Sequence, residues 1–174
     1  MKTIVVLMDS LNRHFLPAYG NDWVETPNID RLAARSCVFD RHFVGSAPCM
    51  PARHDIFTGR LDFLERGWAP RQPFDCTLPY VLRKHGVFSH MTTDHYHYFH
   101  LGGENYHTDF GSWDFIRGQE TDVWVSDLGP LSERAHYGQD ASQYRRNKTR
   151  FTTEADYPSP KTLRHAADWI EEHH

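Results

Sequence analysis

Residues 3–8 read T-I-V-V-L-M, and Asp9 follows them directly. A continuous run rich in β-branched and apolar residues is typical of a strand that is buried on both faces of a parallel sheet. In open sheets of this kind, ligands bind beyond the carboxyl ends of the strands. The run therefore predicts a central strand, and Asp9 is a candidate site residue at its end.

Helices and strands alternate along the chain after this first run. Thr26-Pro27 predicts a helix start, because threonine is a good N-cap and proline is favoured at the first helical position. The further elements that we predict are strands over residues 36–44 and 87–93 and helices from Pro51 to Gly59 and over residues 78–85. This alternation predicts an α/β fold with a mostly parallel central sheet flanked by helices.

The sequence divides into three parts. Residues 1–117 form a core segment that carries the candidate nucleophile, residues 118–158 form a polar excursion, and residues 159–174 form a helix. The middle part is long for a loop in a compact domain, and such loops are often functional or disordered. Because the last helix stops within its apolar pattern, we expect the N-terminal portion of a larger catalytic domain.

The composition of the chain limits the kinds of binding partner and the cellular compartment that we expect. The net charge is -4 with neutral histidines, so we expect neither nucleic acid nor an anionic membrane as a partner. No apolar run approaches the roughly eighteen residues of a membrane span, and the opening lacks a secretory cleavage site. The three cysteines form no C-x-x-C pair, which favours a reducing, cytoplasmic setting over a disulfide framework.

Cys49 lies in the stretch S-A-P-C-M-P-A-R-H, residues 46–54. A free cysteine is commonly a small buried hydrophobe, which is the first interpretation. A helix that starts near Pro51, with Arg53 in its first turn, is also a place for a tetrahedral oxyanion, and Cys49 would face that anion. A thiolate nucleophile of the phosphatase type is a second interpretation, although such loops are usually rich in glycine.

The third interpretation rests on a resemblance. C-M-P-A-R matches C-x-P-x-R, the sulfatase signature, and other pieces occur in the order and spacing of the sulfatase N-terminal region. These pieces are TIVVLMDSLN, LPAYGN, TPNIDRLAARSCVFDRHFV, SAPCMPARHDIFTGR and TLPYVLRKHGVFS. The chain resembles the N-terminal part of a type I sulfatase, or of a closely related phosphonate monoester hydrolase, in the alkaline phosphatase superfamily. The resemblance implies an alkaline-phosphatase-like fold, incomplete in this chain.

The resemblance also implies a chemistry. Cys49 would be converted to formylglycine by a formylglycine-generating or an anaerobic sulfatase-maturating enzyme. One hydroxyl of the hydrated aldehyde would attack the sulfur of a small sulfate ester, and the other would later lose its proton and expel the anion. Asp9 and the modified Cys49 would bind a divalent metal, with calcium first and magnesium or manganese as alternatives. Arg53 would hold the transferred oxyanion.

Two positions depart from the family pattern. Ser10 stands where many sulfatases have a second aspartate, which leaves a phosphonate monoester or phosphodiester hydrolase as an alternative. A lysine-histidine motif that contacts sulfate is replaced by T-T-D-H-Y-H-Y. His95 and His97 would point the same way from extended backbone and are the predicted catalytic contacts. Asp94 and Tyr96 stay open for that role, as do a zinc site and a plain strand end.

Further metal ligands of the family are not visible in this sequence. We therefore expect the 174-residue chain to be inactive alone. A non-catalytic binding protein with unmodified Cys49 is the alternative from another class. An oligomer is compatible with the long polar excursion.

Overall fold

The computed structural model describes residues 2–100, 105–130 and 142–173. The helices are α1 (Pro27–Ala33), α2 (Cys49–Thr58), α3 (Leu78–Lys84), α4 (Ser142–Lys148) and α5 (Pro158–Glu172), and the strands are β1 (His90–Thr93) and β2 (Ser112–Phe115). Short 3-10 helices lie between them, at Arg13–Phe15, Pro17–Tyr19, Tyr96–Phe99, Tyr106–Asp109 and Glu154–Asp156. The helices predicted after Thr26, before Gly59, over 78–85 and at the C-terminal end are confirmed.

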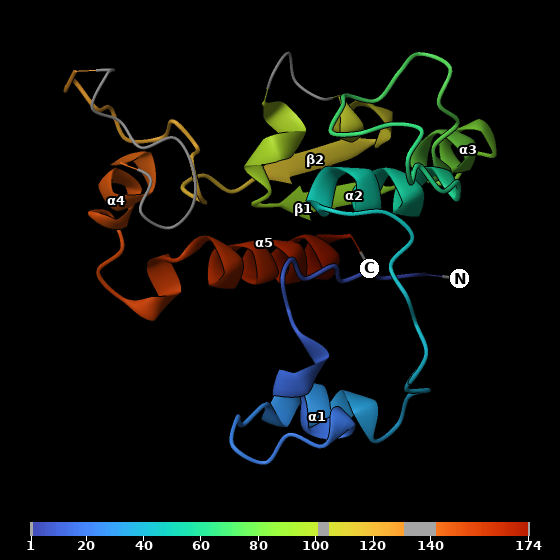
Figure 1. Ribbon diagram of the computed structural model, residues 1–174, viewed down its shortest axis with the longest axis horizontal. Helices are drawn as coiled ribbons and strands as arrows, with labels where there is room; N and C mark the ends of the chain where they lie inside the picture. Colours follow the sequence, from blue (N-terminus) through green and yellow to red (C-terminus); the bar gives the residue numbers. More distant parts are fainter. Residues whose placement is uncertain (1, 101–104, 131–141, 174) are drawn as a thin grey trace.

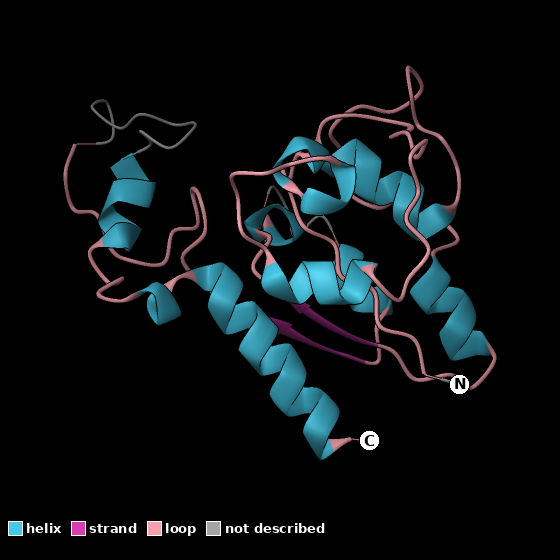
Figure 2. Ribbon diagram, turned by 90° about the horizontal axis from the view of Figure 1, so that it is seen from below, coloured by secondary structure: helices cyan, strands magenta, loops and turns pink. Residues whose placement is uncertain are grey.

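The two strands form a parallel pair in register from His90 opposite Ser112 to Thr93 opposite Phe115. Both views place this pair between α5 on one side and α2 with α3 on the other (Figures 1 and 2). Helix α5 contacts the strand pair through Trp169, whose ring stacks on His90 of β1 at a centroid distance of 4.3 Å. The result is the layered, partial α/β fold that the sequence predicts.

Residues 3–8 do not form the predicted strand. They have no regular secondary structure, no strand pairs with them in the described part of the chain, and Val5 is 76% exposed. Residues 36–44 likewise form no strand, and Phe43 is 81% exposed. Both predictions were wrong. A strand needs backbone hydrogen bonds to a neighbouring strand, and an apolar run favours such pairing but does not determine which segment pairs with it.

The opposite error occurs in the second half of the chain. Strand β2 was not predicted, and α4 lies inside the excursion over 118–158 that was expected to lack helices. Asn147 of α4 is fully buried and anchors that helix, because its side-chain amide donates to the carbonyl of Asp122 over 2.8 Å. Residues 131–141 of the excursion lie outside the described residues. The division of the chain at residues 117 and 158 stays a prediction.

A small core joins α2 to the strands. Its buried members are Met50, Met91, Tyr98 and Tyr106, with Phe57, Phe99 and Phe110 packed around them. Because Met50 follows Cys49 directly, the start of α2 is fixed against β1 and the 3-10 helix that follows it. None of the helices in the described part of the chain is both long and apolar enough to span a membrane.

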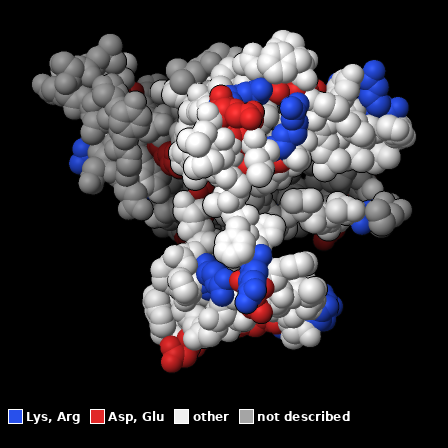
Figure 3. Space-filling model, turned by 45° about the vertical axis from the view of Figure 1, so that its right-hand side comes forward, with Lys and Arg blue, Asp and Glu red and all other residues white. Residues whose placement is uncertain are grey.

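Charges of both signs are mixed on the face shown in Figure 3, where Lys and Arg side chains lie beside Asp and Glu side chains over the α1 lobe and the upper body. Uncharged residues cover most of that face. An anionic ligand that binds here therefore depends on local positive groups, not on a general field.

Candidate active site

Cys49 is the first residue of α2 and is half-buried. Pro48 precedes it as the N-cap, and Gly59 ends the helix in a left-handed conformation, with its N–H donating to the carbonyl of Asp55. Backbone N–H groups in the first turn of a helix have no partner within the helix. Arg53 follows Cys49 by one turn, so both side chains lie on the same face of α2.

The guanidinium of Arg53 is held from two sides. Nη2 donates to Oδ2 of Asp9 over 2.8 Å, and Nη1 donates to the hydroxyl of Tyr98 over 3.0 Å. Arg53 is only 6% exposed, and its Nε has no hydrogen-bond partner among the described residues. A planar donor group fixed in this way, with N–H groups to spare, is suited to an oxyanion.

His95 and His97 come from the segment after β1. The ligand atoms of these two histidines and Sγ of Cys49 all lie within 4.8 Å of one another. Nδ1 of His95 also lies 3.7 Å from Oδ2 of Asp9. The described residues supply no hydrogen-bond partner to either ring nitrogen of His95 or to Nδ1 of His97. The structure thus gathers the predicted site residues into one cluster, while their individual roles stay predictions.

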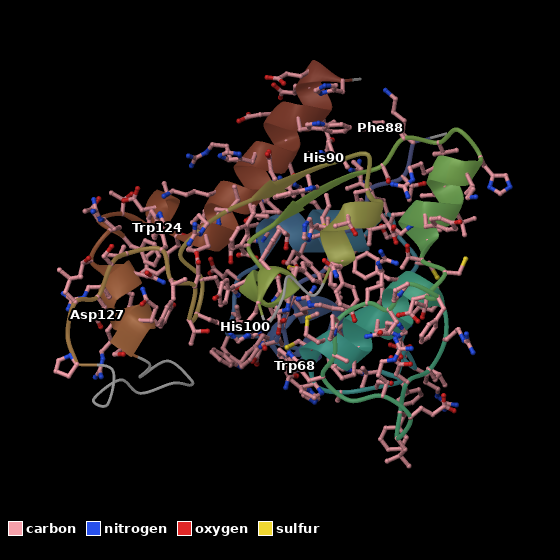
Figure 4. All side chains as sticks on the ribbon, turned by 90° about the horizontal axis from the view of Figure 1, so that it is seen from above. Trp68, Phe88, His90, His100, Trp124 and Asp127 are labelled. Carbon is pink, nitrogen blue, oxygen red and sulfur yellow. The ribbon has the colours of Figure 1, made fainter. Side chains whose placement is uncertain are left out.

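An aromatic and acidic wall borders His97. The ring of Trp68 meets it edge-on at 4.7 Å, and His100 lies at 6.1 Å (Figure 4 labels Trp68 and His100). Oε2 of Glu120 lies 3.4 Å from Nε2 of His97, and Glu120 has a φ of +46°. A non-glycine residue in that region is uncommon and is often held there by its surroundings.

The pKa values of Asp9 and Cys49 are shifted in opposite directions. Burial raises the pKa of Asp9, but hydrogen bonds from Arg53 and Ser10 and the charge of Arg53 outweigh burial and lower it overall. Burial and the charge of Asp9 raise the pKa of the Cys49 thiol, against the opposing charge of Arg53. An unmodified Cys49 is therefore a thiol at neutral pH, which argues against a thiolate nucleophile of the phosphatase type.

Both histidines are uncharged at neutral pH. Burial, with the charges of Arg53 and His97, lowers the pKa of His95 to about 3. Burial and His100 also lower the pKa of His97. Each neutral ring offers one N–H donor and one acceptor nitrogen. Arg53 is then the cation that acts on Asp9 and on these rings.

Asp94 and Tyr96, the alternatives for the sulfate contact, lie at the edge of the cluster. Asp94 accepts a hydrogen bond from Ser159 of α5 over 3.3 Å. Tyr96 packs against His100 with ring centroids 5.3 Å apart. The structure therefore favours His95 and His97 over their neighbours as groups that face Cys49.

Sequence reasoning missed three residues of the site. They are Tyr98, Glu120 and Trp68. None lies in the C-x-P-x-R motif or at the end of a predicted strand. The one signal for Tyr98 was the high density of aromatic residues in its segment, and such residues more often belong to a hydrophobic core than to a site.

A cysteine at a helix start, a buried arginine and an aspartate paired with that arginine form a site on an α/β fold that is suited to an anion. The model of the family described as Sulfatase matches residues 2–158, and the chain belongs to this family. Members of the family generally use formylglycine and a divalent metal.

The curated relatives are sulfatases. A choline-sulfatase of Rhizobium meliloti (strain 1021) is 27% identical over 74% of this chain and 28% of its own length. The iduronate 2-sulfatase of Homo sapiens is 31% identical over 66% of this chain and 22% of its own length. The chain thus spans about a quarter of the length of these relatives. No solved structure shows a significant match to it.

Proposed function

We propose that this chain supplies the nucleophile-bearing part of an active site that hydrolyses sulfate esters and releases inorganic sulfate. The observation that carries the proposal is the position of Cys49 at the start of α2, between the Arg53–Asp9 pair and the uncharged rings of His95 and His97. We further propose that Cys49 is converted to formylglycine, whose hydrate supplies the attacking hydroxyl. A formylglycine-generating or anaerobic maturating enzyme is then a partner.

In this proposal, the charged and the neutral side chains of the site have different roles. Arg53 and the free N–H groups of the first turn of α2 hold the sulfate oxygens, and Tyr98 keeps the guanidinium in place. The neutral ring of His95 or His97 accepts the proton of the attacking hydroxyl or donates an N–H to a sulfate oxygen. Burial of these groups strengthens each interaction, because few water molecules compete.

The acidic groups near residue 49 fit a divalent cation. Burial, with a contribution from Asp9, raises the pKa values of Asp94 and Glu120, so carboxylates crowd in this region at a cost that a cation would remove. We propose that Asp9 and the modified residue 49 hold the metal. Calcium suits oxygen ligands best, and magnesium or manganese are alternatives. A bound metal would lower the pKa of the nucleophilic hydroxyl and stabilise charge on the sulfate.

A phosphonate monoester or phosphodiester hydrolase is the second candidate. The observation that favours it is Ser10, whose hydroxyl donates to Oδ1 of Asp9 over 2.8 Å and adds no carboxylate to the site. Phosphonate monoesters and phosphodiesters carry one negative charge, as sulfate esters do, so a site with one carboxylate fewer would accept them without added repulsion.

Mass spectrometry of the peptide that contains Cys49, from protein made in its native host, tests the nucleophile. Conversion to formylglycine replaces the thiol by an aldehyde and lowers the peptide mass, and intact cysteine throughout would leave a non-catalytic binding protein. Turnover of sulfate, phosphonate and phosphate esters by the full-length enzyme then separates the two activities. Cys49→Ala should abolish turnover, whereas Cys76→Ala, at an exposed cysteine, is the matched control.

A further inference from the structure

A second cluster of ligand atoms lies on a different face of α2. His54 and Asp55 follow Arg53 on the helix, and Asp62 lies in the segment after Gly59. Nδ1 or Nε2 of His54 and one carboxylate oxygen from each aspartate lie within 4.8 Å of one another. Nothing in the anion site uses these groups.

The atoms of this cluster are buried and close to one another. His54 is 2% exposed and Asp62 is 6% exposed. Nδ1 of His54 and Oδ2 of Asp62 lie 2.5 Å apart and are each other's partners, whereas Oδ2 of Asp55 has no hydrogen-bond partner among the described residues. A buried polar atom without a partner costs about 1–3 kcal/mol. A cation placed among these three groups would give the Asp55 oxygen a partner.

Neighbouring residues hold the side chains of His54 and Asp55 in place by hydrogen bonds, as residues behind a metal site hold the metal ligands. Nε2 of His54 lies 3.2 Å from Oδ2 of Asp75, and Oδ1 of Asp55 accepts the backbone N–H of Asp62 over 2.8 Å. A histidine that binds a metal through one nitrogen usually donates its other N–H to a carboxylate. Asp75 is itself held by two hydrogen bonds from Arg66, of 2.7 and 3.1 Å.

Without a metal, Arg66 is a hydrogen-bond partner of His54. Its Nη1 lies 2.8 Å from Nε2 of His54 and donates to that nitrogen when the proton is on Nδ1. Occupation of Nδ1 by a cation would move the proton to Nε2, which then donates to Asp75; Arg66 loses its bond to Nε2 and keeps its two bonds to Asp75.

Charge balance gives the valence of the missing partner. Asp55, Asp62 and Asp75 carry three negative charges when ionised, and Arg66 carries one positive charge. A histidine that binds a metal does so as a neutral ring, so the metal-binding form of the cluster has a net charge of -2 from three carboxylates and one guanidinium. A divalent cation makes the cluster neutral, which buried groups require.

We propose that His54, Asp55 and Asp62 bind a divalent transition metal, with zinc as the best match to one imidazole and two carboxylates. The metal would draw Asp55 inward and separate Nδ1 of His54 from Asp62, since ligand bonds of about 2.1 Å need wider spacing than 2.5 Å between ligands. A Cβ at Gly45 would lie 2.2 Å from Cδ2 of Leu61 and 2.6 Å from Oδ2 of Asp55, so only glycine fits beside this carboxylate. The site would tie the segment after Gly59 to the helix that carries Cys49.

Zinc titration of the full-length protein tests the proposal. The Cys49→Ala background removes the thiol ligand of the neighbouring Cys49, His95 and His97 cluster. Asp62→Asn is compared in that background with Asp168→Asn, the same change at an exposed position on α5. Affinity is measured by competition with a chromophoric chelator, and thermal unfolding is followed in parallel.

We expect the background protein and Asp168→Asn to bind one zinc ion tightly and to unfold at a higher temperature with zinc. Asp62→Asn should bind this ion at least 100-fold more weakly, and Asp75→Asn about 10–100-fold more weakly, as is usual for a group behind a ligand. Equal affinity in Asp62→Asn and Asp168→Asn, or an unfolding temperature that zinc does not change in the background protein, would overturn the proposal.

A second measurement does not depend on how the variants fold. X-ray absorption at the zinc edge of the unmutated protein with one equivalent of zinc should show nitrogen and oxygen ligands and no sulfur. A sulfur ligand would place the ion at Cys49 and would overturn the proposal.

Discussion

Replacing Tyr98 by phenylalanine removes one of the two anchors of Arg53. The phenylalanine ring keeps the packing against Phe57, whose centroid lies 6.0 Å away, so the change leaves no cavity. What is lost is the 3.0 Å hydrogen bond from Nη1 of Arg53, in a residue that is 6% exposed. Water therefore does not replace the hydroxyl as a partner.

The expected cost follows from the charge on the donor. A hydrogen bond to a charged group contributes about 1.5–3 kcal/mol, and an unpaired buried donor costs a similar amount. We expect Tyr98→Phe to lower the free energy of unfolding by about 2 kcal/mol, with a melting temperature about 4–8 °C lower for a domain of this size. Since Arg53 also loses its orientation, kcat/KM of the full-length enzyme for a sulfate ester should fall by about tenfold, which corresponds to about 1.4 kcal/mol.

Urea unfolding measures the first quantity, and steady-state kinetics measure the second. Tyr96→Phe is the control, because it removes the same hydroxyl from a less buried residue, whereas the hydrogen bond from Arg53 goes to Tyr98. A loss below about 0.5 kcal/mol in Tyr98→Phe, the range of ordinary surface substitutions, would refute the idea that this hydroxyl anchors the guanidinium.

Three further predictions concern the rest of the fold. Gly118→Ala should destabilise the protein by at least about 1 kcal/mol in urea unfolding, because Gly118 has a φ of +109° and a Cβ would lie 2.8 Å from Trp124. The control is Gly67→Ala, where a Cβ meets nothing within 4 Å, and this change should be close to neutral. Asn147→Ala should cost about 2–3 kcal/mol and speed amide hydrogen exchange in α4, since the buried side chain bonds to Asp122 and Val125; unchanged exchange would contradict this. Four hydrogen bonds from Thr152 and Thr153 hold the pKa of Asp156 well below its ordinary value of 3.8, so the stability that they add is complete above that value and is lost as the pH falls further below it. NMR titration of the Asp156 carboxyl checks this shift, and an ordinary pKa would contradict it.

The sequence allowed the centre of the site to be predicted from local rules. Asp9 ends an apolar run, and Cys49 and Arg53 lie one turn apart at a helix start. Each of these relations involves residues that are close in sequence, so one segment is enough to define it. His95 and His97 both come close to Cys49, but from the start of the 3-10 helix Tyr96–Phe99 and not from the extended backbone on which the prediction relied.

The remaining parts of the fold depend on distant partners. Tyr98 meets Arg53 across 45 positions and Glu120 meets His97 across 23, and no local pattern encodes such pairs. Residues 3–8 show the same limit, because their composition fits a strand but their neighbour is not set by composition. The cluster around His54 escaped prediction because Asp62 reaches it through a turn after Gly59 that no motif marks.

Burial at the start of α2 has a consequence for the order of events in biosynthesis. Pro51 and Arg53, which belong to the C-x-P-x-R sequence, are both buried once the helix has formed. A maturation enzyme that reads these two side chains cannot reach them in the folded chain. Under the proposed function, conversion of Cys49 would precede folding, and a cell that folds the protein faster than it modifies it would accumulate an unconverted form.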